Sequence, residues 1–161
     1  MRKIFLVLLW GLFMMAPQQS EAQFLKKLGK IAESVGKDMW DGITNGPFQV
    51  AAEKGTCTIA DVTCSLQTAA RKETDLYLAV TVQNDKDDDV TIDFSNVKVI
   101  DAEGNSYNCV LSPKSNMELI SGVPIKVTII AKGVAQDIRS LTLVRLGTAE
   151  KGKAEWRNVT F

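Results

Sequence analysis

From about residue 56 to the end of the chain, apolar and polar residues alternate, and this period of two limits the fold more than any other feature. Successive side chains of a β-strand point to opposite faces, so alternation indicates strands with one buried face. The pattern predicts strands at residues 61–67, 75–84, 90–94, 97–101, 107–111, 123–131, 140–146 and 156–161. The turn residues at 102–105 predict a hairpin between two of them. No helical pattern separates the strands, which favours an antiparallel sandwich or barrel of seven to eight strands.

The first 22 residues have the pattern of a secretory signal peptide. Two basic residues, Arg2 and Lys3, precede an apolar run at 4–16, and the small residue Ala22 precedes the expected cleavage site. The run is shorter than the roughly 20 residues that a membrane-spanning helix needs, although an uncleaved anchor is the alternative. We therefore expect a mature protein that begins at Gln23 and is exported in soluble form to the periplasm or the extracellular medium.

Residues 23–47 are predicted to form one amphipathic helix that ends at the Asn-Gly-Pro sequence 45–47. Apolar residues recur at helical spacing at Phe24, Leu28, Ile31, Val35, Met39 and Ile43. This stripe either packs on the β domain or binds a partner or a second copy, with Phe24, Leu25 and Leu28 as the candidate contact residues. Contact with a membrane surface is less favoured, because acidic residues are interspersed with the lysines of the polar face.

Without the leader the chain has 139 residues, enough for one ordinary core, which we place at residues 48–161. The leader contains Arg2, Lys3 and Glu21, so the mature chain has 17 basic and 18 acidic residues. A strongly basic domain is the usual sign of nucleic-acid binding. The near-neutral balance therefore predicts no nucleic-acid partner.

The chain has no histidine, which excludes several kinds of active site. Histidine is the commonest general base and metal ligand near neutral pH, so a Ser-His or Cys-His nucleophile cannot be built. Asp85, Asp87 and Asp89 alternate like the first ligands of a calcium loop. Val90 and Asn96 stand where such a loop needs Gly and Glu, so a solvated hairpin loop is the better interpretation. We expect no catalytic residues, no cofactor and no metal.

Three cysteines, Cys57, Cys64 and Cys109, are an odd number for an oxidising compartment. One disulfide with one free thiol is the simplest arrangement, and three buried thiols are the alternative. Cys64 and Cys109 both lie on the apolar side of alternating segments. The pattern therefore predicts a Cys64–Cys109 disulfide, with Cys57 as the free thiol.

Three segments resemble the telokin-like, immunoglobulin-type sandwich family of secreted bacterial proteins. They are the strand Leu78-Ala79-Val80-Thr81-Val82-Gln83-Asn84, the turn Asp101-Ala102-Glu103-Gly104-Asn105-Ser106-Tyr107, and Gly122-Val123-Pro124 before the strand at 125–129. The likeness covers roughly residues 56–161 and leaves out the predicted helix. It implies an immunoglobulin-like antiparallel β-sandwich that serves as a binding or structural module, and it transfers no catalytic residue.

We therefore expect an exported, non-catalytic module that acts through protein–protein interaction or self-association. A histidine-independent enzyme is an alternative, for example a glycosidase with two carboxylates in a cleft. A third interpretation is an inhibitor or immunity-type protein that acts through an exposed loop such as residues 112–122.

Overall fold

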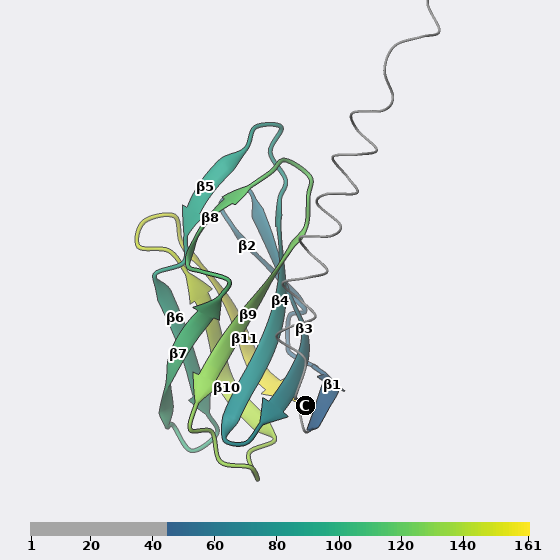
Figure 1. Cartoon of the computed structure of the whole chain (residues 1–161), viewed down its shortest axis with the longest axis vertical. Helices are drawn as coiled ribbons and strands as arrows, with labels where there is room; N and C mark the ends of the chain where they lie inside the picture. The colour runs from purple at the N-terminus through teal and green to yellow at the C-terminus, as the bar shows by residue number, and fades with distance from the viewer. Residues whose placement is uncertain (1–44) are drawn as a thin grey trace, which may run out of the picture. The chain divides into compact units, whose positions relative to one another are not determined.

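The computed structural model describes residues 45–161, which form a curled antiparallel β-sheet and contain no helix (Figure 1). The strands of this part are β1 (Asn45–Gln49), β2 (Thr56–Ile59), β3 (Val62–Lys72), β4 (Asp75–Asn84), β5 (Val90–Asp93), β6 (Asn96–Asp101), β7 (Ser106–Ser112), β8 (Asn116–Leu119), β9 (Ile125–Lys132), β10 (Ser140–Gly147) and β11 (Lys153–Thr160). The main path has the order β1-β3-β4-β9-β7-β6-β10-β11. A separate two-stranded sheet pairs β5 with β8.

The long strand β3 accommodates two partners on one side. β2 pairs with its first part, from Val62 to Ser65, and β1 pairs with its second part. The chain that follows β1 then meets the other end of the path. Ala51 N–H donates to Thr160 O at 3.0 Å, and Thr160 N–H donates to Ala51 O at 2.8 Å. These two bonds join the segment that follows β1 to β11, the last strand of the main path.

The core lies inside the curl, where the period of two places one apolar side chain at every second position. Leu76, Leu78, Val80 and Val82 of β4 are fully buried. Trp156 of β11 is the largest fully buried side chain in residues 45–161. Burial of aromatic and branched side chains of this kind is the main favourable term in folding.

The structure confirms that the chain is mainly β in the part described. All eight predicted strand segments contain observed strands, and the β6–β7 hairpin is present, with Val99 opposite Tyr107 and Ile100 opposite Ser106. The sequence pattern missed β1, β2 and β8. β8 lies inside the segment 112–122, for which the sequence predicts an exposed loop, so part of that segment is a strand paired with β5.

The predicted leader and most of the predicted helix lie outside the described residues, together with Phe24, Leu25 and Leu28. The expected helix end at 45–47 is wrong, because β1 begins at Asn45. The backbone there pairs with β3, with Asn45 opposite Arg71 and Phe48 opposite Ala69. The β domain therefore begins three residues earlier than the expected boundary at residue 48.

The register of the strands does not fit the predicted Cys64–Cys109 disulfide. Cys109 of β7 is in register, through β9 and β4, with Arg71 of β3. Cys64 lies seven residues from Arg71 along β3, which is about 23 Å at the rise of a strand. A disulfide needs Cα atoms within about 7 Å, so these two cysteines cannot be bridged.

Candidate functional site

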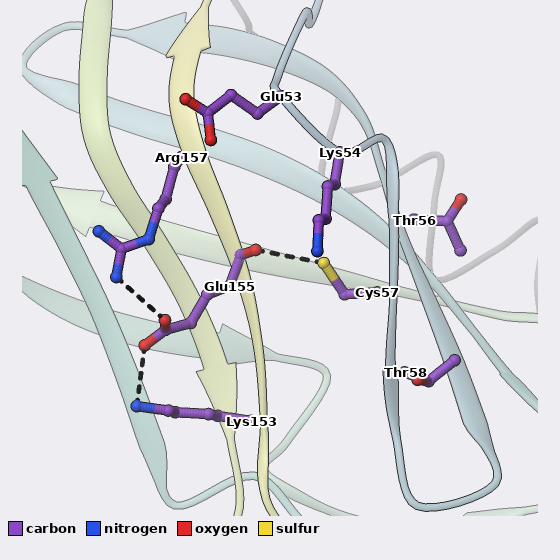
Figure 2. A pocket seen from close by; sticks show the side chains of 8 residues that line it. All are labelled: Glu53, Lys54, Thr56, Cys57, Thr58, Lys153, Glu155 and Arg157. Atoms are coloured by element: carbon purple, nitrogen blue, oxygen red, sulfur yellow. Dashed lines mark hydrogen bonds and ion pairs between the residues drawn. The ribbon is translucent and has the colours of Figure 1, made fainter.

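A groove of about 550 Å³ lies between β2 and β11 (Figure 2). Most of its lining side chains are exposed and polar or charged. They are Glu53, Lys54, Thr56, Cys57, Thr58, Lys153, Glu155 and Arg157. Two segments about a hundred residues apart in the sequence thus form its two walls.

The groove exists because the chain bonds to β11 at residues 51–53 and then turns away, so that β2 pairs with β3. The N–H of Glu53 still donates to Arg157 O at 3.1 Å. Beyond that bond the two segments are linked by side chains: Trp156 Nε1 donates to Gly55 O at 3.3 Å, and the Cys57 thiol donates to Glu155 O at 3.2 Å. The separation leaves an open channel between two strand edges.

β2 pairs with β3 on one side, and within residues 45–161 its other edge is open. Leu66 N–H donates to Gly55 O at 3.2 Å, so this opposed pair is hydrogen-bonded. Hydrogen-bonded and non-hydrogen-bonded pairs alternate along an antiparallel ladder. Cys57 and Cys64 are therefore a hydrogen-bonded pair, whereas the N–H and C=O groups of Thr56 and Thr58 point away from β3, at the open edge of β2.

Glu155 is the centre of the ion pairs on the β11 wall. Its carboxylate contacts Arg145 at 2.6 Å, Lys153 at 3.2 Å and Arg157 at 3.4 Å. The hydrogen bond from Arg145 and the nearby lysine hold the pKa of Glu155 below its usual range. Glu155 therefore stays ionised, and its charge is already compensated within the domain.

On the wall formed by residues 53–58, the charges are less fully paired. Among residues 45–161 no carboxylate lies within ion-pair distance of Lys54. Glu53 accepts a hydrogen bond from the Asn158 amide. With three cations and two carboxylates on its walls, the groove carries a small positive excess.

The cysteines lie in different environments. Cys57 is half-buried in the groove wall, whereas Cys64 is fully buried next to it, and burial raises the pKa of the Cys64 thiol to about 12. Cys109 is half-buried on β7, far from both along the sheet. The structure thus places Cys57 in the groove and does not bring Cys64 and Cys109 together.

The acidic loop between β4 and β5 is held by hydrogen bonds. Asp85 accepts from Thr63 and Gln83, and Asp89 accepts from Ser121 N–H at 2.9 Å. No group of three or more Cys, Asp or Glu side chains in residues 45–161 is arranged to hold a metal ion.

The sequence pattern did not predict the charged residues of the groove. The available signal was the alternation in Lys153-Ala154-Glu155-Trp156-Arg157, where charged residues alternate with two buried ones. That pattern shows that Lys153, Glu155 and Arg157 share the outer face. It does not show that residues 53–58 lie beside them.

No protein-family model and no curated protein matches this chain. Among solved structures, the yjhA protein from Bacillus subtilis is similar, with 13% sequence identity and a TM-score of 0.44. The match covers 60% of this chain and 80% of the other. Within residues 45–161 there is no helix of the length and apolarity needed to cross a membrane.

Proposed function

We propose that the chain is an exported, non-catalytic binding module that holds an acidic, extended segment of a partner protein in the groove between β2 and β11. The observation that carries this proposal is the placement of Lys54, Lys153 and Arg157 on both walls of one open channel. The only carboxylate between the two cations of β11, Glu155, is already paired with them and with Arg145. A partner carboxylate would therefore meet an uncompensated cation at Lys54.

The edge of β2 supports an extended partner. The outward backbone groups of Thr56 and Thr58 can pair with a strand, as in other cases where a peptide adds to a sheet edge. Backbone hydrogen bonds of this kind would supply affinity, and the flanking cations would select acidic side chains.

We also propose that the domain is an immunoglobulin-like sandwich. Strand β7 supports this, because it pairs with β6 at Ser106 and Tyr107 and with β9 from Asn108 to Ser112. A strand that changes partner in this way can link two packed sheets, β3-β4-β9 and β6-β10-β11. The resemblance to the telokin-like family points to the same architecture.

A carboxylate-pair glycosidase is less well supported at this groove. Such an enzyme needs one carboxylic acid whose pKa is raised, so that it can protonate the leaving group. The hydrogen bond from Arg145 lowers the pKa of Glu155 instead. The geometry therefore suits Glu155 to organising cations and does not suit it to general-acid catalysis.

Titration of the full-length protein with a fluorescent poly-glutamate peptide tests the binding proposal. We expect saturable binding that weakens as salt is added, because the contacts are ionic and exposed. Lys54→Glu and Arg157→Glu each change the charge by two units, so each should weaken binding about 30-fold, at on the order of 1 kcal/mol for each unit. Lys126→Glu is the matched control, because Lys126 is an exposed lysine on β9 that does not line the groove. Equal losses in all three variants, or equal binding of poly-lysine, would refute a role for the groove.

Export is tested separately by the intact mass of protein recovered from the periplasm or medium. A chain that begins at Gln23 supports the proposal. A chain that retains Met1 and is found in the membrane fraction contradicts it.

A further inference from the structure

Cys57 and Cys64 lie directly opposite each other in the β2–β3 ladder. Both side chains are on the inner face of the hairpin, Cys57 beside Ile59 and Cys64 between Val62 and Leu66. Opposed residues in such a hydrogen-bonded pair have Cα atoms about 5.5 Å apart. This separation is within the range of about 4.4–6.8 Å found for disulfides.

We propose that Cys57 and Cys64 form a reversible cross-strand disulfide when the protein meets a low-molecular-weight disulfide oxidant. Cys57 is the entry point, because it lines the groove, whereas Cys64 is fully buried. Cys109 takes no part, because the register of β7 with β3 places it far from both.

The exchange proceeds in two balanced steps. The Cys57 thiol loses its proton to solvent, and its sulfur attacks one sulfur of the oxidant, which releases one thiolate and leaves a mixed disulfide. The Cys64 sulfur, after loss of its proton, attacks the Cys57 sulfur and releases the second thiolate. The released thiolates take up the two protons, so the oxidant is reduced to two thiols while the protein loses two hydrogen atoms.

The bond would change the contact between β2 and β11. In the reduced protein the Cys57 S–H donates to Glu155 O at 3.2 Å. Once oxidised, Cys57 has no hydrogen to donate and its sulfur is held toward β3. Oxidation therefore removes one of the few links that span the groove.

Peptide mapping of the folded, full-length protein after treatment with oxidised glutathione tests the proposal. Trypsin releases both cysteines in the single peptide 55–71 and Cys109 in the peptide 99–114. After denaturation and alkylation, we expect peptide 55–71 to be unalkylated and lighter by two hydrogen atoms, and peptide 99–114 to be alkylated. Cleavage before Asp61 should then give two pieces that stay linked until they are reduced.

The Cys109→Ser variant should form the same bond, and the same treatment in guanidinium chloride should give a mixture of linkages, since the selectivity comes from the fold. A bond from Cys109 to either of the other cysteines in the folded protein overturns the proposal. So does full alkylation of all three cysteines, or a stable glutathione adduct at Cys57 without loss of the Cys64 thiol.

Discussion

The phenol of Tyr107 donates a hydrogen bond to Asp101 Oδ2 at 2.5 Å and closes the β6–β7 hairpin from the inside. The same carboxylate accepts from the backbone N–H groups of Glu103 at 2.9 Å and Asn105 at 2.8 Å. Asp101 is fully buried, so these donors replace the water that it loses. The bond from Tyr107 is the main cause that lowers the pKa of Asp101 from 3.8 to about 2.

We expect the folded protein to lose stability as the pH falls from about 4 to about 2. Asp101 has a lower pKa in the folded protein than its ordinary value of 3.8. Its contribution to the free energy of unfolding is therefore fully present above its pKa in the unfolded chain. This contribution is lost as the pH falls through its pKa in the folded protein. Melting temperatures measured across this range check the prediction.

Tyr107→Phe provides the comparison, because it removes the donor and brings the pKa of Asp101 nearer to its ordinary value. The variant should melt below the parent at pH 6, and the difference should shrink toward pH 2. Asp87→Asn, in the exposed 85–89 loop, should follow the parent at every pH. A constant difference between Tyr107→Phe and the parent would show that the hairpin bond does not depend on the charge of Asp101.

Trp156 connects the core to the start of the groove. Its ring is fully buried, and Nε1 donates to Gly55 O at 3.3 Å. Trp156→Ala should lower the free energy of unfolding by about 3–5 kcal/mol, because it leaves a large cavity. Trp156→Phe keeps most of the apolar contact and should cost less, about 1–3 kcal/mol. Urea unfolding measures both, and a loss below about 1 kcal/mol for Trp156→Ala would contradict this role.

Arg71 is a buried cation that holds the connection between β9 and β10. Its guanidinium donates to the carbonyls of Val134, Ala135 and Ile138 and lies 5.5 Å from the centre of the Phe161 ring. Arg71→Met should cost about 2–4 kcal/mol, because three carbonyls lose a charged donor. Arg71→Lys should recover only part of this, because an ammonium group lacks the planar fork of donors.

A double-mutant cycle separates the ring contact from the carbonyl contacts. Phe161→Leu combined with Arg71→Met should give a coupling energy of about 0.5–2 kcal/mol.

Hydrogen exchange at residues 133–139 should accelerate in Arg71→Met and stay unchanged in Phe161→Leu. Equal exchange in both variants would mean that Arg71 does not organise this connection.

Local patterns predicted most of the strands because each strand is defined by its own residues. The alternation of residues 75–84 marks both ends of β4. β2 has only two inward residues, Cys57 and Ile59, and β8 has only Met117 and Leu119, so their alternation is too short to detect. Short strands of this kind form because a longer neighbouring strand supplies their hydrogen bonds. The sequence of a single segment does not show which strand will lie beside it.

The cysteine pairing and the groove both depend on which strands are neighbours in the sheet. Alternation placed Cys64 on an inner face but could not show that β2 lies beside β3 and that β7 is three strands away. In the same way, the pattern of β11 showed a charged face but not its neighbour at Glu53 and Lys54. Contacts between residues far apart in the sequence decide which strands are adjacent. Local alternation of apolar and polar residues does not reveal these contacts.

Glu155→Gln tests whether the cations of the groove bind an acidic peptide. The substitution removes the carboxylate that pairs with Arg145, Lys153 and Arg157, and the partly exposed ion pairs suggest a loss of about 1 kcal/mol in the free energy of unfolding. The freed cations should bind the poly-glutamate peptide roughly fivefold more tightly, which corresponds to about 1 kcal/mol for one charge near the ligand. Glu118→Gln on β8 makes the same charge change at an exposed site outside the groove and should alter neither property. Weaker peptide binding by folded Glu155→Gln would mean that Glu155 contacts the ligand directly, and the binding module would then lose its proposed basis in uncompensated cations.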